Sequence, residues 1–206
     1  MGRKRRFDSD DALDVAMRLF WERGYAGTSI GDLTLAMGIK RPSLYNVFGS
    51  KERLFRLALR RYERTRLGFM WRALRRSTVR AVIGDFLDGL LDLVTGSDTP
   101  KGAFDINAAI ACSAGSERVR LLLVSRRTFY RRLLRRRFHS AQEQGELGAA
   151  VQPEVLAHLV LMLGGGLALQ AKAGVSRPAL EKAIKLVLVA IPVANGQSSF
   201  AEGTAR

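Results

Sequence analysis

The stretch that most constrains the fold of this chain lies near its N-terminus, at residues 28–51. Its sequence, TSIGDLTLAMGIKRPSLYNVFGSK, predicts two short helices joined by a tight turn. Ser29 is placed to cap the first helix, and Asp32 three residues later completes a capping box. Gly38 can take the positive φ of a sharp turn, and Pro42 fits the first turn of the second helix, where a missing N–H is tolerated. This layout is that of a helix-turn-helix.

The two helices of the motif have distinct faces. The apolar surface of the first comes from Ile30, Leu33 and Leu35. In the second, three residues at spacing i, i+3 and i+4 are expected to face inward: Leu44, Val47 and Phe48. The outer side is left with Arg41, Ser43, Tyr45 and Asn46. A short helix that is buried by one face and offers hydrogen-bond donors on the other is suited to reading DNA.

The chain resembles the TetR family of transcriptional regulators from about Asp10 to Phe55. The matching positions are Phe20, Gly24, Tyr25, Thr28, Ser29, Asp32, Leu33, Gly38, Leu44, Tyr45, Phe48, Lys51 and Glu52. The resemblance implies an all-α homodimer of about nine helices per chain, with a helix-turn-helix DNA-binding domain at 1–50, a ligand-binding and dimerisation domain at 51–195 and a flexible tail at 196–206. It also implies a repressor that binds a palindromic operator in double-stranded DNA and is released by a small-molecule effector.

The resemblance assigns roles to the residues of the motif. It implies that Thr28, Tyr45 and Lys51 grip the DNA backbone, with Lys40 close by and Ser29 in the same surface. The candidates to meet base edges are Arg41, Pro42, Ser43 and Asn46, since arginine prefers guanine and asparagine prefers adenine. The family often has a small hydroxyl residue where Lys40 stands, so we expect the second helix to be less well capped here. The basic arm at residues 3–6 is either a minor-groove contact or a solubilising tail.

Composition agrees with a partner that is a polyanion. The chain has a formal net charge of +15 and a pI near 11.1, which attracts polyanions without selecting one. A non-specific nucleic-acid binder is therefore an alternative function. The single cysteine excludes an intramolecular disulfide,, and no signal peptide is visible. Both observations favour a cytoplasmic protein.

The rest of the chain predicts further helices at 51–71, 78–94, 104–114, 116–144, 153–173 and from 178 onward. On the second of these, Asp85, Asp88 and Asp92 share one face; they line a pocket for a cation or pair with arginines of the body. Nine arginines lie between Arg118 and Arg137. They form either a second nucleic-acid surface or a solvated face with ion pairs.

The last two helices are strongly apolar, and the resemblance implies that they form the dimer interface. The residues predicted there are Val155, Leu159, Met162, Leu163, Leu180, Ile184, Val187, Leu188 and Ile191. The alternative is an intrachain core. A membrane-spanning role is disfavoured on length, since a spanning helix needs ~20 apolar residues and this stretch contains His158 and Gln170. A peripheral membrane protein stays a less favoured alternative.

The chemistry of an enzyme is missing from the sequence. It has no glycine-rich phosphate loop, no His/Cys spacing for a metal and no nucleophile elbow, so we expect no catalytic residues, no cofactor and no metal. For an effector of unknown identity, the predicted pocket residues are Phe86, Leu90, Phe104, Cys112, Phe129 and Leu133. Whether the regulator represses or activates stays open at this stage.

Overall fold

The computed structural model describes residues 8–110 and 117–191, and all the regular structure in these residues is helical, which confirms the all-α fold. Ten helices are present in them, one more than expected. They are α1 (Ser9–Arg23), α2 (Ile30–Met37), α3 (Arg41–Phe48), α4 (Lys51–Arg66), α5 (Gly68–Leu74), α6 (Val79–Thr95), α7 (Phe104–Ile110), α8 (Glu117–Glu143), α9 (Pro153–Lys172) and α10 (Arg177–Ala190). The basic arm, Cys112 and the tail lie outside the described residues.

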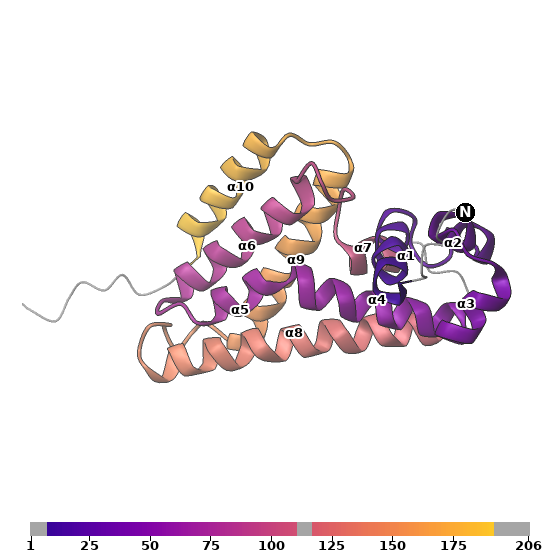
Figure 1. Cartoon of the computed structure of the whole chain (residues 1–206). Helices are drawn as coiled ribbons and strands as arrows, with labels where there is room; N and C mark the ends of the chain where they lie inside the picture. Colours follow the sequence, from indigo (N-terminus) through magenta and orange to yellow (C-terminus); the bar gives the residue numbers. More distant parts are fainter. Residues whose placement is uncertain (1–7, 111–116, 192–206) are drawn as a thin grey trace, which may run out of the picture.

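The molecule is elongated, with a small helical head at one end and a larger body at the other (Figure 1). Helices α1, α2 and α3 gather at the right of this view, and α4 runs from them into the body. The long helix α8 passes along the lower edge from the body to beneath the head. The motif predicted to read DNA therefore lies at one extremity, where a rod-like partner can approach it.

The additional helix results from a break after Arg66. The predicted helix over 51–71 is divided at Leu67, whose φ of −96° and ψ of 20° leave the helical region. Gly68 follows at the first position of α5, and glycine is about 1 kcal/mol less favourable in a helix than alanine. The prediction of one continuous helix was therefore wrong because this weak point turns the chain.

An aromatic and aliphatic core holds the head together. Phe20 of α1 packs edge-on against Phe55 of α4, with ring centroids 5.2 Å apart. Leu33 of α2 and Leu44 of α3 are fully buried against this core. Burial of a leucine side chain contributes about 1.5–3 kcal/mol, so these contacts fix short helices that would not form alone.

The head is joined to the body by buried hydrogen bonds between α1 and the region of α7. The indole Nε1 of Trp21 donates to the carbonyl of Gly102 at 2.7 Å, and the amide Nδ2 of Asn107 donates to the carbonyl of Trp21 at 2.8 Å. Trp21 also packs edge-on against Tyr62 of α4, with centroids 4.9 Å apart. The two hydrogen bonds connect residues more than 80 positions apart, and together with the ring contact they fix the orientation of α1 on the body.

In the body, α9 lies against α6 and α8. A Cβ built on Gly164 would lie 3.1 Å from Leu90 Cδ2 and 3.2 Å from Phe86 Cε1, so glycine permits the close approach of α9 and α6. With 20 residues and a mean hydropathy of 1.5, α9 is long and apolar enough to cross a membrane, so the argument from its length was wrong. Its packing against α6 and α8 accounts for the apolar sequence equally well.

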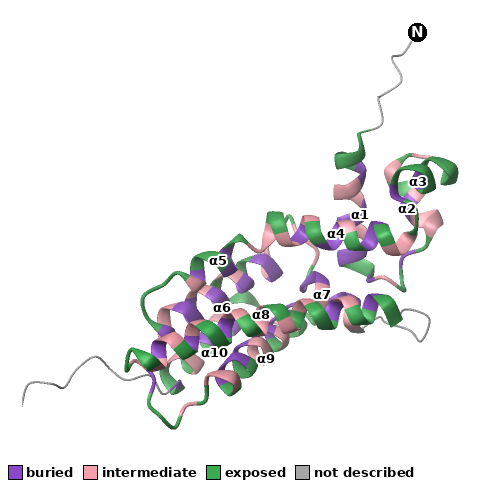
Figure 2. Ribbon diagram, turned by 90° about the horizontal axis from the view of Figure 1, so that it is seen from below, coloured by how far each residue is buried: buried purple, intermediate pink, exposed green. Residues whose placement is uncertain are grey.

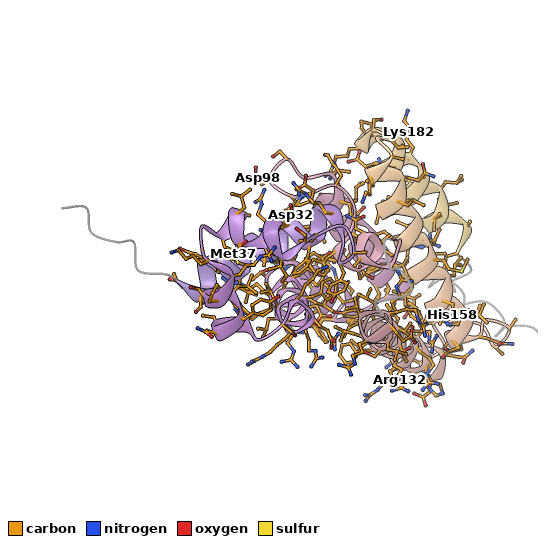
Figure 3. The ribbon with its side chains drawn as sticks, turned by 90° about the vertical axis from the view of Figure 1, so that its right-hand side faces the viewer. Asp32, Met37, Asp98, Arg132, His158 and Lys182 are labelled. Carbon is orange, nitrogen blue, oxygen red and sulfur yellow. The ribbon has the colours of Figure 1, made fainter. Side chains whose placement is uncertain are left out.

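The charged faces of the body are mostly internally paired. Asp85 pairs with Arg76 at 2.5 Å and Asp92 with Arg177 at 2.6 Å, and no metal-binding cluster occurs in the part of the chain that the structure describes. Asp85 and Asp92 therefore pair with arginines of the body, whereas Asp88 on the same face forms no ion pair with a described residue. On α8, ion pairs join Arg126 to Glu63 and Arg131 to Glu154. Other arginines of α8, such as Arg132, point outward into solvent (Figure 3).

Candidate DNA-binding surface

The turn between α2 and α3 is fixed by local hydrogen bonds. The backbone N–H of Asp32 donates to Ser29 Oγ at 3.0 Å, and the N–H of Ser29 donates to Asp32 Oδ2 at 2.7 Å, which completes the predicted capping box. Hydrogen bonding to Ser29 holds the pKa of Asp32 below its ordinary value. Gly38 ends α2 with a φ of 66°, as expected for the turn. The orientation of α3 relative to α2 follows from these constraints.

The outward face of α3 carries most of the residues predicted to meet DNA. Leu44 and Phe48 are buried and anchor the helix, while five residues are exposed on it: Arg41, Pro42, Ser43, Tyr45 and Asn46. Figure 2 shows this helix at the edge of the molecule with most of its ribbon exposed. The hydroxyl of Tyr45 and the amide of Asn46 form no hydrogen bond with any described residue. These donors and acceptors are therefore free to bind a partner.

Two apolar side chains of the motif are exposed, and one of them, Val47, was predicted to face inward. Val47 is 40% exposed and Leu35 is 85% exposed. An eight-residue helix such as α3 buries only a narrow stripe, and Leu44 and Phe48, one turn apart, already fill it. The inward assignment of Val47 was wrong for this reason.

Lys40 occupies the N-cap position of α3 without capping it. Its backbone is extended, and no side chain accepts a hydrogen bond from the first turn. A lysine has no acceptor to offer those N–H groups, so the weaker capping expected from the sequence is confirmed. The exposed ammonium group is left available for an anion.

Lys51 lies at the first position of α4, where its Nζ is 4.2 Å from the centroid of the Tyr25 ring. Ser50 caps this helix by accepting from the N–H of Arg53 at 3.1 Å. Burial lowers the pKa of Lys51, and the carboxylate of Asp32 partly offsets this effect. Tyr25 therefore holds the lysine beside the helix N-terminus, where a phosphate would find favourable charge.

Thr28, predicted to grip the DNA backbone, lies inside the head. Its side chain is fully buried, and its Oγ1 donates to the carbonyl of Gly24 at 2.8 Å. A buried hydroxyl with a satisfied hydrogen bond has no atom to offer a phosphate. In this structure the hydroxyl of Thr28 supports the turn between α1 and α2, and the contact of Thr28 with the DNA backbone stays a prediction.

The predicted effector residues are not brought together. Phe86 and Leu90 are buried at the packing of α6 on α9, whereas Phe104 contacts the rings of Phe55 and Tyr62 beside the head. Phe129 is 37% exposed against Trp71; Leu133 is half-buried on α8, and Cys112 lies outside the described residues. The five described residues thus pack against different neighbours, and their assignment to one effector pocket stays a prediction.

A hollow of about 530 Å³ lies elsewhere, between the last turns of α8 and the start of α9. Its polar lining includes Arg135, Arg136, His139 and Glu154. The sequence did not indicate this hollow, because it depends on how the two consecutive helices α8 and α9 fold back on one another after the loop that joins them. No periodicity in either helix marks such a meeting point.

The nine predicted dimer residues differ in burial: three are exposed, three are half-buried and three are buried. Val155, Leu159 and Met162 are exposed on α9, and Leu163, Val187 and Leu188 are half-buried. The remaining three are buried within the chain: Leu180, Ile184 and Ile191. A side chain already buried has little area left for a partner, so these three belong to the intrachain core. The exposed apolar surface extends instead to Leu169, Leu186 and Val189.

Comparisons with known proteins agree with this geometry. Residues 12–58 match the model of bacterial regulatory proteins of the tetR family, and residues 78–187 match the tetracyclin repressor-like C-terminal domain. The HTH-type transcriptional repressor ComR of Escherichia coli (strain K12) is 35% identical over 188 residues, which cover 90% of this chain and 88% of ComR.

Solved structures of TetR-family regulators also resemble this chain. A cysteine mutant of the TetR family transcriptional regulator CifR, complexed with 26 bp of double-strand operator DNA, has a TM-score of 0.86 and 38% identity, with 93% of this chain and 100% of that chain covered. A TetR transcriptional regulator from Chloroflexus aurantiacus J-10-FL, at 23% identity, shares the fold with a TM-score of 0.77 over 87% and 91% of the two chains. The protein described here belongs to the TetR family of bacterial transcriptional regulators.

Proposed function

We propose that the protein is a homodimeric repressor that places α3 of each protomer in the major groove of a palindromic operator. The observation that carries this proposal is the exposed, unpaired outer face of α3 on a head held rigidly by capping and core packing. Two recognition helices related by two-fold symmetry match half-sites ~34–36 Å apart or slightly more. Arg41 and Asn46 supply base-edge donors; Lys40, Tyr45 and Lys51 hold the phosphates.

The second copy packs, in this proposal, on the apolar side chains that α9 and α10 leave uncovered. Met162 is 71% exposed, and Leu186 and Val189 are exposed to a similar extent. Large apolar patches on a soluble protein mark interaction surfaces. In a two-fold symmetric dimer the same patch is buried on both protomers. A small-molecule effector binds the body more tightly when the two heads are placed so that they do not fit the operator. Such a ligand shifts the population away from the DNA-binding form. The protein then acts in the cytoplasm, where its operator lies.

Footprinting of the DNA that flanks the gene tests the proposal. Purified protein should protect an inverted repeat and prefer it to a duplex of unrelated sequence. Arg41→Ala and Asn46→Ala should each lower the preference for the inverted repeat by about tenfold or more, since one bidentate base contact contributes ~1–3 kcal/mol of discrimination. Arg72→Ala removes an exposed cation from α5 and serves as the control. Equal affinity of the wild type for both duplexes would overturn the proposal.

A further inference from the structure

Arg53 lies at the junction between the recognition helix and α4. It is the third residue of α4, and its backbone N–H donates to Ser50 Oγ at 3.1 Å, which fixes the position of its Cα. Its side chain folds back over Gly49, the residue that ends α3. A Cβ built on Gly49 would lie 3.4 Å from both Cδ and Nη1 of Arg53. The guanidinium therefore lies beside the end of α3.

The guanidinium of Arg53 is unpaired within the part of the chain that the structure describes. It forms no ion pair there, and its side chain donates no hydrogen bond. The nearest acid along the chain is Glu52, whose carboxylate is turned to Arg56 at 3.0 Å and to Arg118 at 3.7 Å. All the N–H donors of this exposed arginine are therefore available.

The neighbours of Arg53 indicate what its partner would be. Gly49, on which the side chain rests, donates its N–H to the carbonyl of Tyr45 at 2.8 Å, and Lys51 lies two residues before Arg53. Tyr45 and Lys51 are the residues assigned to the DNA backbone under the proposed function. Arginine binds phosphate in a bidentate, charge-assisted manner. A phosphate bound between Tyr45 and Lys51 would therefore lie close enough for the guanidinium of Arg53 to attract it.

We propose that Arg53 is a further DNA-binding residue, which contacts a backbone phosphate next to the one bound by Lys51. This inference rests on the proposed function, because it requires α3 to lie in the groove. Gly49 is part of the arrangement: its φ of 79°, which favours glycine, turns the chain between α3 and α4 where the guanidinium lies. The contact adds affinity without adding sequence preference, since phosphates carry no base identity.

The test compares Arg53→Ala with Arg60→Ala. Arg60 lies on the same face of α4, seven residues further from the head, which is ~10 Å along the helix axis. It is also exposed and unpaired among the described residues. Both variants therefore lose one positive charge from one helix face, and only Arg53 lies next to the end of α3. Binding is measured by fluorescence anisotropy at several salt concentrations, with a duplex of mixed sequence and with the protected inverted repeat.

We expect Arg53→Ala to weaken binding to both duplexes by roughly tenfold for each protomer at physiological salt, the order of a charge-assisted contact, and so by roughly a hundredfold for the dimer. The slope of log K against log salt should fall by ~1.8, the loss of one phosphate contact per protomer. Arg60→Ala should leave this slope unchanged. Arg53→Gln, which is neutral but keeps most of the side-chain length, should reproduce the loss, and a thermal melt confirms that each variant is folded.

Two results would overturn the inference. An unchanged slope for Arg53→Ala excludes a phosphate contact, and equal losses for Arg53→Ala and Arg60→Ala show a general effect of charge. If the wild type prefers the inverted repeat and either result is found, the inference alone fails. If the wild type shows no preference for the inverted repeat, the proposed function fails first.

Discussion

The burial of Thr28 makes a prediction that separates a structural role from a DNA contact. Thr28→Val keeps the shape of the side chain and removes the hydroxyl that donates to Gly24 at 2.8 Å. The carbonyl of Gly24 is then left without this donor in the interior, which costs about 1–3 kcal/mol. For a chain of this size each kcal/mol lowers Tm by about 2–4 °C, so we expect a decrease of about 2–12 °C. Differential scanning calorimetry measures it.

The DNA affinity of the folded variant should not change. Below its melting temperature, Thr28→Val should bind a mixed-sequence duplex with the salt dependence of the wild type, because a fully buried side chain contacts no phosphate. Thr28→Ser retains the hydroxyl, so it should bind DNA like the wild type whether the hydroxyl supports the turn or contacts a phosphate. A slope smaller by ~1.8, the loss of one phosphate contact per protomer, with an unchanged Tm, would refute the reasoning and place Thr28 on the DNA surface.

Three further predictions concern α9 and the start of α3. Gly164→Ala should destabilise the protein by about 1–3 kcal/mol through overpacking, because the new Cβ would lie 3.1 Å from a leucine methyl. Gly166→Ala, whose Cβ would have nothing within 4 Å, should not destabilise it. Urea unfolding of the two variants measures the difference. Met162→Glu should raise the dissociation constant of the dimer at least a hundredfold, as measured by analytical ultracentrifugation,. Leu121→Glu, which replaces an exposed apolar residue of α8, should leave this constant unchanged. Lys40→Ser should raise stability by about 1 kcal/mol through restored capping while lowering the salt slope of DNA binding; a slope that stays constant would remove Lys40 from the phosphate contacts.

The head was predictable because its signals are local. The capping box of Ser29 and Asp32, the positive φ of Gly38 and the early proline of α3 each depend on residues within four positions of one another. Such signals act on the backbone before any tertiary contact forms. The exposure of Tyr45 followed from the same reasoning, since the period of α3 leaves only one side for the core.

Some of the burial depends on contacts between distant residues, which the period of one helix does not show. In α1, Met17 and Trp21 are both buried. Trp21 is covered because α4 and α7 both pack on α1, and its indole reaches a carbonyl 81 residues away. Periodicity within one helix cannot reveal how many neighbours that helix has. A ligand pocket lined by several helices depends on such contacts too, so the predicted pocket residues stay a prediction.

The strengths of the contacts between head and body determine how they can move relative to one another. The ion pair between Arg118 of α8 and Glu52 of α4 is 3.7 Å long, and its arginine is 84% exposed, so it contributes at most about 1 kcal/mol. The hydrogen bonds from Trp21 and Asn107 are buried, and breaking one costs about 1–3 kcal/mol. The exposed pair therefore yields first, and α1 moves with α7 as one unit. Further along α8, Arg126 and Tyr130 donate to Glu63 of α4 at 2.6 and 2.8 Å, so only the first turns of α8 separate from α4 at little cost. A displacement of α7 is therefore expected to carry α1 with it.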